Sequence, residues 1–87
     1  MFNKVELWEE LEANKCFLAN GFNNAIVGIS YGAEPKTVYS VHKIIEILIE
    51  EDGMEWEEAM EHFSYNIGGA YIGEKTPIFI YDLDEQE

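Results

Sequence analysis

Apolar residues recur at every third position near the start of the chain, and Glu occupies three of the six positions between them. These apolar residues are Phe2, Val5, Trp8 and Leu11. A single apolar stripe of this kind is typical of an amphipathic helix. The spacing predicts a helix over residues 3–13, with Asn3 as its N-cap and Asn14 at its end.

Three short segments are apolar without a helical stripe, which is typical of strands. They are residues 25–30, 37–39 and 76–83. In the last segment, Ile78 and Ile80 share one face, and Phe79 lies on the opposite face with Tyr81. An aromatic Tyr39 or Phe79 on the outer face of the sheet would indicate a binding surface or a second layer.

The residues between the first helix and the first strand contain the turn signal Asn20-Gly21. Phe17 and Leu18 precede this signal, so the pattern also indicates a hairpin around residues 20–24 that leads into the strand at residues 25–30. Gly28, inside the apolar run of the first strand, indicates a bulge or a close approach of another backbone.

Two further helices are predicted in the middle of the chain. The apolar stripe of the first one consists of Val41, Ile44, Ile45, Leu48 and Ile49. This stripe predicts a helix over residues 41–51, with Ser40 as its N-cap and Gly53 as a left-handed C-cap. The second helix is expected over residues 55–66.

These elements follow the order α-β-β-α-α-β within a single acidic domain, residues 1–87. Residues 70–72 are interpreted as a further strand or a turn, and residues 84–87 as a frayed tail. The expected fold class is α+β. It consists of a three- or four-stranded, mostly antiparallel sheet with helices packed on one face.

The charge of the chain narrows the possible functions. The sequence has 18 Asp and Glu against five Lys and no Arg, which gives a net charge of −13. Such a charge repels phosphates, so direct binding to nucleic acid or to an anionic membrane is disfavoured. A basic protein surface is the natural electrostatic partner, although the charge could also serve only solubility.

Carboxylates are densest around the junction of the two middle helices, where no Lys balances them. The candidate partner-binding residues are Glu50, Glu51, Asp52, Glu55, Glu57, Glu58 and Glu61. Seven charges over about 18 Å of helix approach the charge density of duplex DNA within about a factor of two. Imitation of a nucleic-acid backbone is therefore physically reasonable. The alternative is an ordinary solvated face of two amphipathic helices.

Recognisable catalytic or metal-binding patterns are lacking. His42, His62 and Cys16 do not have the spacing of a zinc site, and neither histidine is near Cys16 in sequence. Asp52-Gly53-Met54 does not fit a calcium-binding loop. We expect no enzyme activity, no cofactor and no metal. Since neither a signal peptide nor a long apolar run is present, the expected location is the cytosol.

Two segments carry a resemblance. One runs from Ile45 to Met54 and continues through Glu57-Glu58-Ala59, Phe63 and Tyr65-Asn66, and the other runs from Gly69 to Phe79. Over roughly residues 22–80 the sequence resembles a family of small acidic bacteriophage-type proteins of unknown function. The resemblance implies a phage-type origin and a shared fold, and it assigns no catalytic residue. Such sequences usually have Ser or Thr at position 55, so Glu55 predicts a looser helix start.

Together these patterns favour an interaction protein, namely a phage-type inhibitor that binds a basic, nucleic-acid-binding host protein. It would act as a nucleic-acid mimic, for example against a nuclease, a CRISPR effector or a polymerase. Two alternatives stay open. One is a small-molecule-binding protein or enzyme, with a ligand held by Gly-rich turns and by Tyr39, Tyr65, Tyr71 and Tyr81. The other is a homodimeric accessory protein whose acidity serves only solubility.

Overall fold

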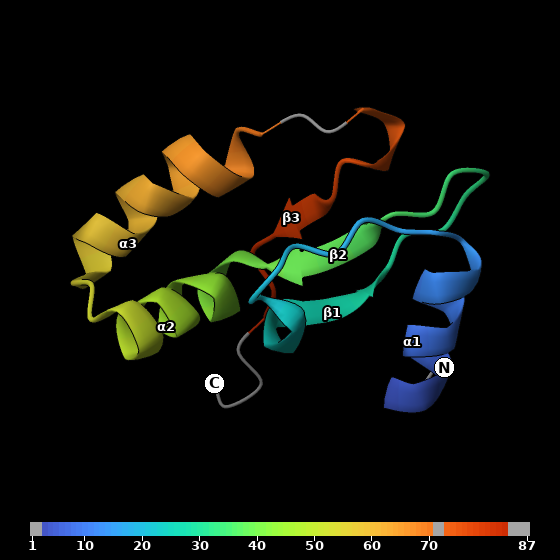
Figure 1. The fold of residues 1–87 in the computed structure, drawn as a ribbon, viewed down its shortest axis with the longest axis horizontal. Helices are drawn as coiled ribbons and strands as arrows, with labels where there is room; N and C mark the ends of the chain where they lie inside the picture. The colour runs from blue at the N-terminus through green and yellow to red at the C-terminus, as the bar shows by residue number, and fades with distance from the viewer. Residues whose placement is uncertain (1–2, 71–72, 84–87) are drawn as a thin grey trace.

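The computed structural model describes residues 3–70 and 73–83 (Figure 1). Its helices are α1 (Lys4–Ala13), α2 (Val41–Asp52) and α3 (Trp56–His62), and its strands are β1 (Ile26–Ile29), β2 (Thr37–Ser40) and β3 (Ile78–Ile80). Short turns of other helix types lie at Asn23–Ala25, Phe63–Gly68 and Gly73–Lys75. This order confirms the predicted α+β class. Residues 71, 72 and 84–87, for which a strand or turn and a frayed tail were expected, lie outside the described residues.

The three strands form one sheet in the order β1-β2-β3. Strands β1 and β2 are antiparallel neighbours in a hairpin, whereas β2 and β3 run parallel, with Tyr39 opposite Phe79. The sheet is therefore mixed, with one pair of each kind. A parallel pair needs a crossover connection, and α2 and α3 provide it. The register of the hairpin shifts between Ile26 and Gly28, which confirms the expected bulge.

The expected strand at residues 25–30 is confirmed as β1, but the expected hairpin around residues 20–24 is wrong. The hairpin instead connects β1 to β2 through residues 30–36. The segment before β1 bonds to side chains of β2 rather than to a backbone ladder. The Thr37 hydroxyl donates to the carbonyl of Phe17 over 2.7 Å, and the N–H of Ala19 donates to the Tyr39 hydroxyl over 2.7 Å. The Asn20-Gly21 turn therefore bends the chain toward β1 without pairing two strands.

Local side-chain bonds fix the helix ends, as the sequence predicts. The Asn3 side chain accepts from the N–H of Glu6 at 2.8 Å, and the Glu6 carboxylate accepts from the N–H of Asn3 at 3.0 Å. The Ser40 hydroxyl accepts from the N–H of Lys43 at 3.1 Å. Gly53 ends α2 with a φ of +68°, a left-handed conformation that suits glycine. The predicted caps of α1 and α2 are confirmed.

The core lies between the sheet and the pair formed by α2 and α3. It contains Ala25, Tyr39, Val41, Ile44, Ile45, Leu48, Ala59 and Phe63. The rings of Tyr39 and Phe79 stack at 5.7 Å, and Phe63 meets Phe79 edge-on at 5.3 Å. Tyr39 and Phe79 thus face the core, so neither of them marks a binding surface on the outer face of the sheet.

The second middle helix changes its winding before it ends. Regular α-helix stops at His62, and a π-helical segment continues over Phe63–Gly68. The ring of Phe63 lies directly over Gly68, where an added Cβ would come within 2.9 Å of a ring carbon. The missing side chain at Gly68 is therefore what lets Phe63 reach the core from this widened turn.

Candidate functional site

The seven candidate carboxylates are all exposed and lie around the junction of α2 and α3, which we call the acidic corner. It consists of Glu50, Glu51, Asp52, Glu55, Glu57, Glu58 and Glu61, and every one of these residues is exposed. Because the left-handed turn at Gly53 joins the end of α2 directly to the start of α3, the two helix ends meet (Figure 1, left). Residues from both helices therefore contribute to the same corner.

Cations of the chain do not neutralise this corner. Within residues 3–70 and 73–83, no salt bridge involves a carboxylate of the acidic corner; the ion pair found there joins Lys75 to Glu34. Chain-wide, no lysine lies between Lys43 and Lys75. The field of these carboxylates is thus directed into the solvent.

The helix dipoles act in opposite ways on the two halves of the corner. Glu57 and Glu58 lie in the first turn of α3, where the partial positive charge of the helix end stabilises a carboxylate. Glu58 also accepts a long hydrogen bond of 3.4 Å from the N–H of Glu55. This bond gives the start of α3 a partial capping box although position 55 lacks Ser or Thr.

The other half of the corner lies at the unfavourable end of a helix. Glu50, Glu51 and Asp52 occupy the last turn of α2, which has no basic residue. A carboxylate near a helix C-terminus loses roughly 0.3–1 kcal/mol through its interaction with the dipole. The stability of the fold therefore does not explain why three carboxylates lie there.

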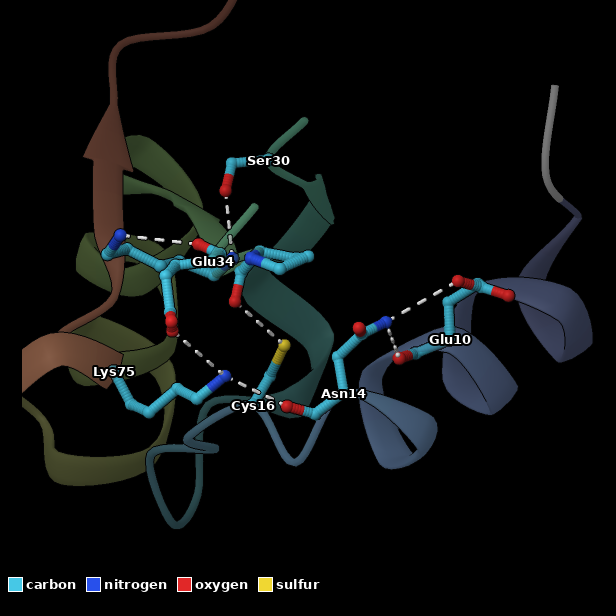
Figure 2. A network of polar contacts seen from close by, with 8 residues as sticks. Glu10, Asn14, Cys16, Ser30, Glu34 and Lys75 are labelled. Carbon is cyan, nitrogen blue, oxygen red and sulfur yellow. Dashed lines mark hydrogen bonds and ion pairs between the residues drawn. The ribbon is translucent and has the colours of Figure 1, made fainter. Parts of the chain in front are cut away.

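At the opposite end of the molecule, a lysine links separate segments of the chain. The Lys75 ammonium donates to the carbonyl of Asn14 at 3.0 Å and lies 3.9 Å from the Glu34 carboxylate (Figure 2). It thereby joins the end of α1 to the β1–β2 turn. Beside it, the half-buried Cys16 thiol contacts the carbonyl of Pro35 at 3.4 Å. Cys16 and Lys75 thus hold the segments around the hairpin together.

A small apolar pocket, which the sequence analysis did not predict, lies between the segment before β1, the π-helical turn and β3. Its volume is about 290 Å³. It is lined by Phe17, Ala19, Asn20, Phe22, Asn66, Ile67, Ala70, Pro77 and Phe79. This volume is at the lower limit for a ligand pocket, and none of these nine described residues is titratable. They offer apolar contact and two amide side chains, and no group suited to acid–base chemistry.

The described tyrosines that could have formed a ligand site lie in different surroundings. Tyr39 is fully buried, and Tyr65 and Tyr81 are largely exposed; none of these three lines the pocket. Tyr71 lies outside the described residues. Burial raises the pKa of the Tyr39 phenol, although its hydrogen bond with the N–H of Ala19 opposes this shift. Tyr39 is a structural residue of the core.

The described part of the chain shows no group of three or more His, Cys, Asp or Glu that could hold a metal ion. Its helices are also too short or too polar to cross a membrane. Comparison with known proteins finds no matching family model, no similar curated protein and no similar solved structure. The resemblance to phage-type proteins therefore stays a prediction, and the function has to be argued from the surface itself.

Proposed function

We propose that the protein binds a basic surface of another protein through the acidic corner and occupies a site that otherwise holds nucleic acid. In this proposal it is a phage-type inhibitor that acts in the cytosol of the host. The observation that carries the proposal is the position of Glu50, Glu51 and Asp52. These carboxylates are exposed, form no salt bridge within the described residues and lie at the helix end that disfavours them.

A carboxylate that serves solubility alone can lie on any exposed position. At the end of α2, each carboxylate adds to the partial negative charge of the last helical carbonyls. A Lys or Arg side chain of a partner would meet both kinds of acceptor. Charge-assisted hydrogen bonds of this type are stronger than neutral ones. A partner whose cations are already positioned to bind phosphates would form such bonds most readily.

The net charge also predicts how fast the protein associates with its partner. A net charge of −13 on 87 residues attracts a basic surface over distances longer than direct contact. Association is therefore expected to be fast at low salt and to slow as ions screen the field. Once bound, seven carboxylates spaced nearly as densely as phosphates would exclude DNA or RNA from the same surface.

The test uses two variants with the same change in charge. The first one replaces Glu51, Glu57 and Glu61 by Lys, and it keeps Glu58 because that side chain helps to cap α3. The control variant replaces Glu9, Glu10 and Glu12 by Lys, which are exposed residues of α1. Tagged protein captures basic proteins from a host lysate, and each captured protein is then purified for affinity measurements.

The first variant should lose binding, whereas the control variant should keep most of it. Nucleic acid should compete with the unmodified protein, and the affinity should fall steeply between about 50 mM and 500 mM salt. Equal losses in the two variants would show that only net charge matters. Binding that tolerates both salt and the first variant would contradict the proposal.

A further inference from the structure

The sheet has one edge that the fold leaves open. Among the residues that the structure describes, strand β3 has β2 as its only neighbour in the sheet. Outside that ladder, the backbone of Ile78, Phe79 and Ile80 forms no hydrogen bond within residues 3–70 and 73–83. The other edge strand, β1, has α1 packed against it, and Leu11 of that helix is buried (Figure 1). The outer backbone groups of β3 are therefore unpaired within these residues, and β3 is the more exposed of the two edge strands.

The side chains of β3 do little to protect this edge. In natural proteins, charged residues, bulges or a covering element usually prevent edge strands from pairing with other chains. Strand β3 contains no charged residue, and its pairing with β2 shows no bulge. Ile78 and Ile80 share one face and are 38% and 36% exposed. Pro77 and the shortness of the strand are the protective features that remain.

The charges that flank the edge indicate which kind of segment fits it. Glu74 precedes the strand and Asp82 follows it, and both are exposed. Of the nearby cations, Lys75 is already engaged with Asn14 and Glu34, and Lys43 acts on Asp82 from the first turn of α2. A second copy of this chain would bring the same negative charge to the edge, whereas a basic segment would be attracted to it.

We propose that the free edge of β3 pairs with an extended, basic segment of the partner, in which Lys or Arg alternates with apolar residues. Backbone groups of β3 bond to the added strand, and apolar side chains of that strand pack beside Ile78 and Ile80. Cations of the segment then lie near Glu74 and Asp82. The expectation that the segment is basic rests on the function proposed above. The expectation that the edge of β3 is free to pair does not.

The experiment uses the isotope-labelled protein and short synthetic peptides as probes. One peptide alternates Lys with Val, a second carries N-methyl groups on alternate residues and so lacks N–H donors along one edge, and a third alternates Gln with Val. Amide NMR signals and hydrogen exchange are followed for Ile78, Phe79 and Ile80. The Lys peptide should shift these signals and protect the outward amides, with affinity about tenfold or more above that of the N-methylated peptide.

A protein variant tests the packing of the side chains. Ile78→Thr with Ile80→Thr keeps β-branched residues in the strand but removes apolar surface, so the Lys peptide should bind several-fold more weakly. Val5→Thr is the control, since Val5 is an exposed residue of α1. Its affinity for the peptide should not change.

Three outcomes would overturn the inference. If the N-methylated peptide binds equally well and shifts only α3, the peptide binds the acidic corner alone, and the proposed function survives without the edge. If the Gln peptide binds as tightly as the Lys peptide, the edge pairs without preference for a basic segment. If protection of β3 rises with protein concentration in the absence of peptide, the occupant of the edge is a second copy.

Discussion

The Ser40 hydroxyl donates a 2.6 Å hydrogen bond to the Asp82 carboxylate. The same oxygen accepts from the N–H of Lys43, so one buried side chain both caps α2 and holds the residues after β3. Ser40 and Asp82 are separated by 42 residues in sequence. A single short polar side chain therefore links the start of the crossover to its end.

Replacement of Ser40 by Ala should lower the free energy of unfolding by about 1–3 kcal/mol, because it removes an N-cap and a charge-assisted hydrogen bond. Urea unfolding monitored by circular dichroism measures this change. Ser40→Thr keeps the hydroxyl and should recover part of the loss. An unchanged midpoint for Ser40→Ala would mean that water replaces both bonds at no cost.

The pH dependence of stability should reveal the same bond. The hydrogen bond from Ser40 lowers the pKa of Asp82 below its ordinary value of 3.8, and Lys43 and His42 add to this effect. Because the pKa is lower in the folded state than in the unfolded state, the bond stabilises the protein above about pH 4. This contribution is lost as the pH falls through the folded-state pKa.

Comparison with Asp82→Asn isolates this contribution from the many other carboxylates. The wild-type protein should be the more stable of the two at pH 7, and the difference should shrink as the pH falls below about 4. Urea midpoints for both proteins at each pH measure it. A difference that does not depend on pH would contradict the assignment to Asp82.

Replacement of Gly68 by Ala should destabilise the protein by about 1–3 kcal/mol, because the new Cβ would press against the ring of Phe63. Gly28→Ala is the matched control, since a Cβ at Gly28 meets no heavy atom within 4 Å. Thermal unfolding of both variants gives the comparison. Equal stability of the two would show that Phe63 can move without cost.

Replacement of Tyr39 by Phe keeps the ring stacked on Phe79 but leaves the N–H of Ala19 without its acceptor. A loss of about 1–3 kcal/mol is expected in urea unfolding. Tyr81→Phe, at an exposed position, should have no effect. If both changes prove neutral, the segment before β1 does not depend on this bond.

The helices could be predicted from the sequence because their signals are local. The bonds between Asn3 and Glu6 span three residues, and the cap at Gly53 depends on one backbone conformation. The hairpin was misplaced because Asn20-Gly21 is a valid turn signal whose outcome depends on distant partners. Those partners are the side chains of Thr37 and Tyr39, which bond to this segment.

The candidate surface was only partly predictable. Exposure of the acidic corner follows from the apolar stripe of α2, since carboxylates that avoid this stripe must face the solvent. The opposite effects of the helix dipoles on its two halves depend on where α2 ends and α3 begins. The sequence pattern predicts these boundaries only approximately. The pocket and the open edge of β3 were not predictable, because segments far apart in sequence form both.

The parallel alignment of β2 and β3 sets an order for folding. The β1–β2 hairpin closes a short loop, whereas β3 can join only after α2 and α3 have crossed over the sheet. Strand β3 is therefore expected to dock late during folding and to detach first in the native state, with the fastest-exchanging amides of the sheet. A partner strand added to its edge would slow this opening, so binding would also prolong the lifetime of the folded protein.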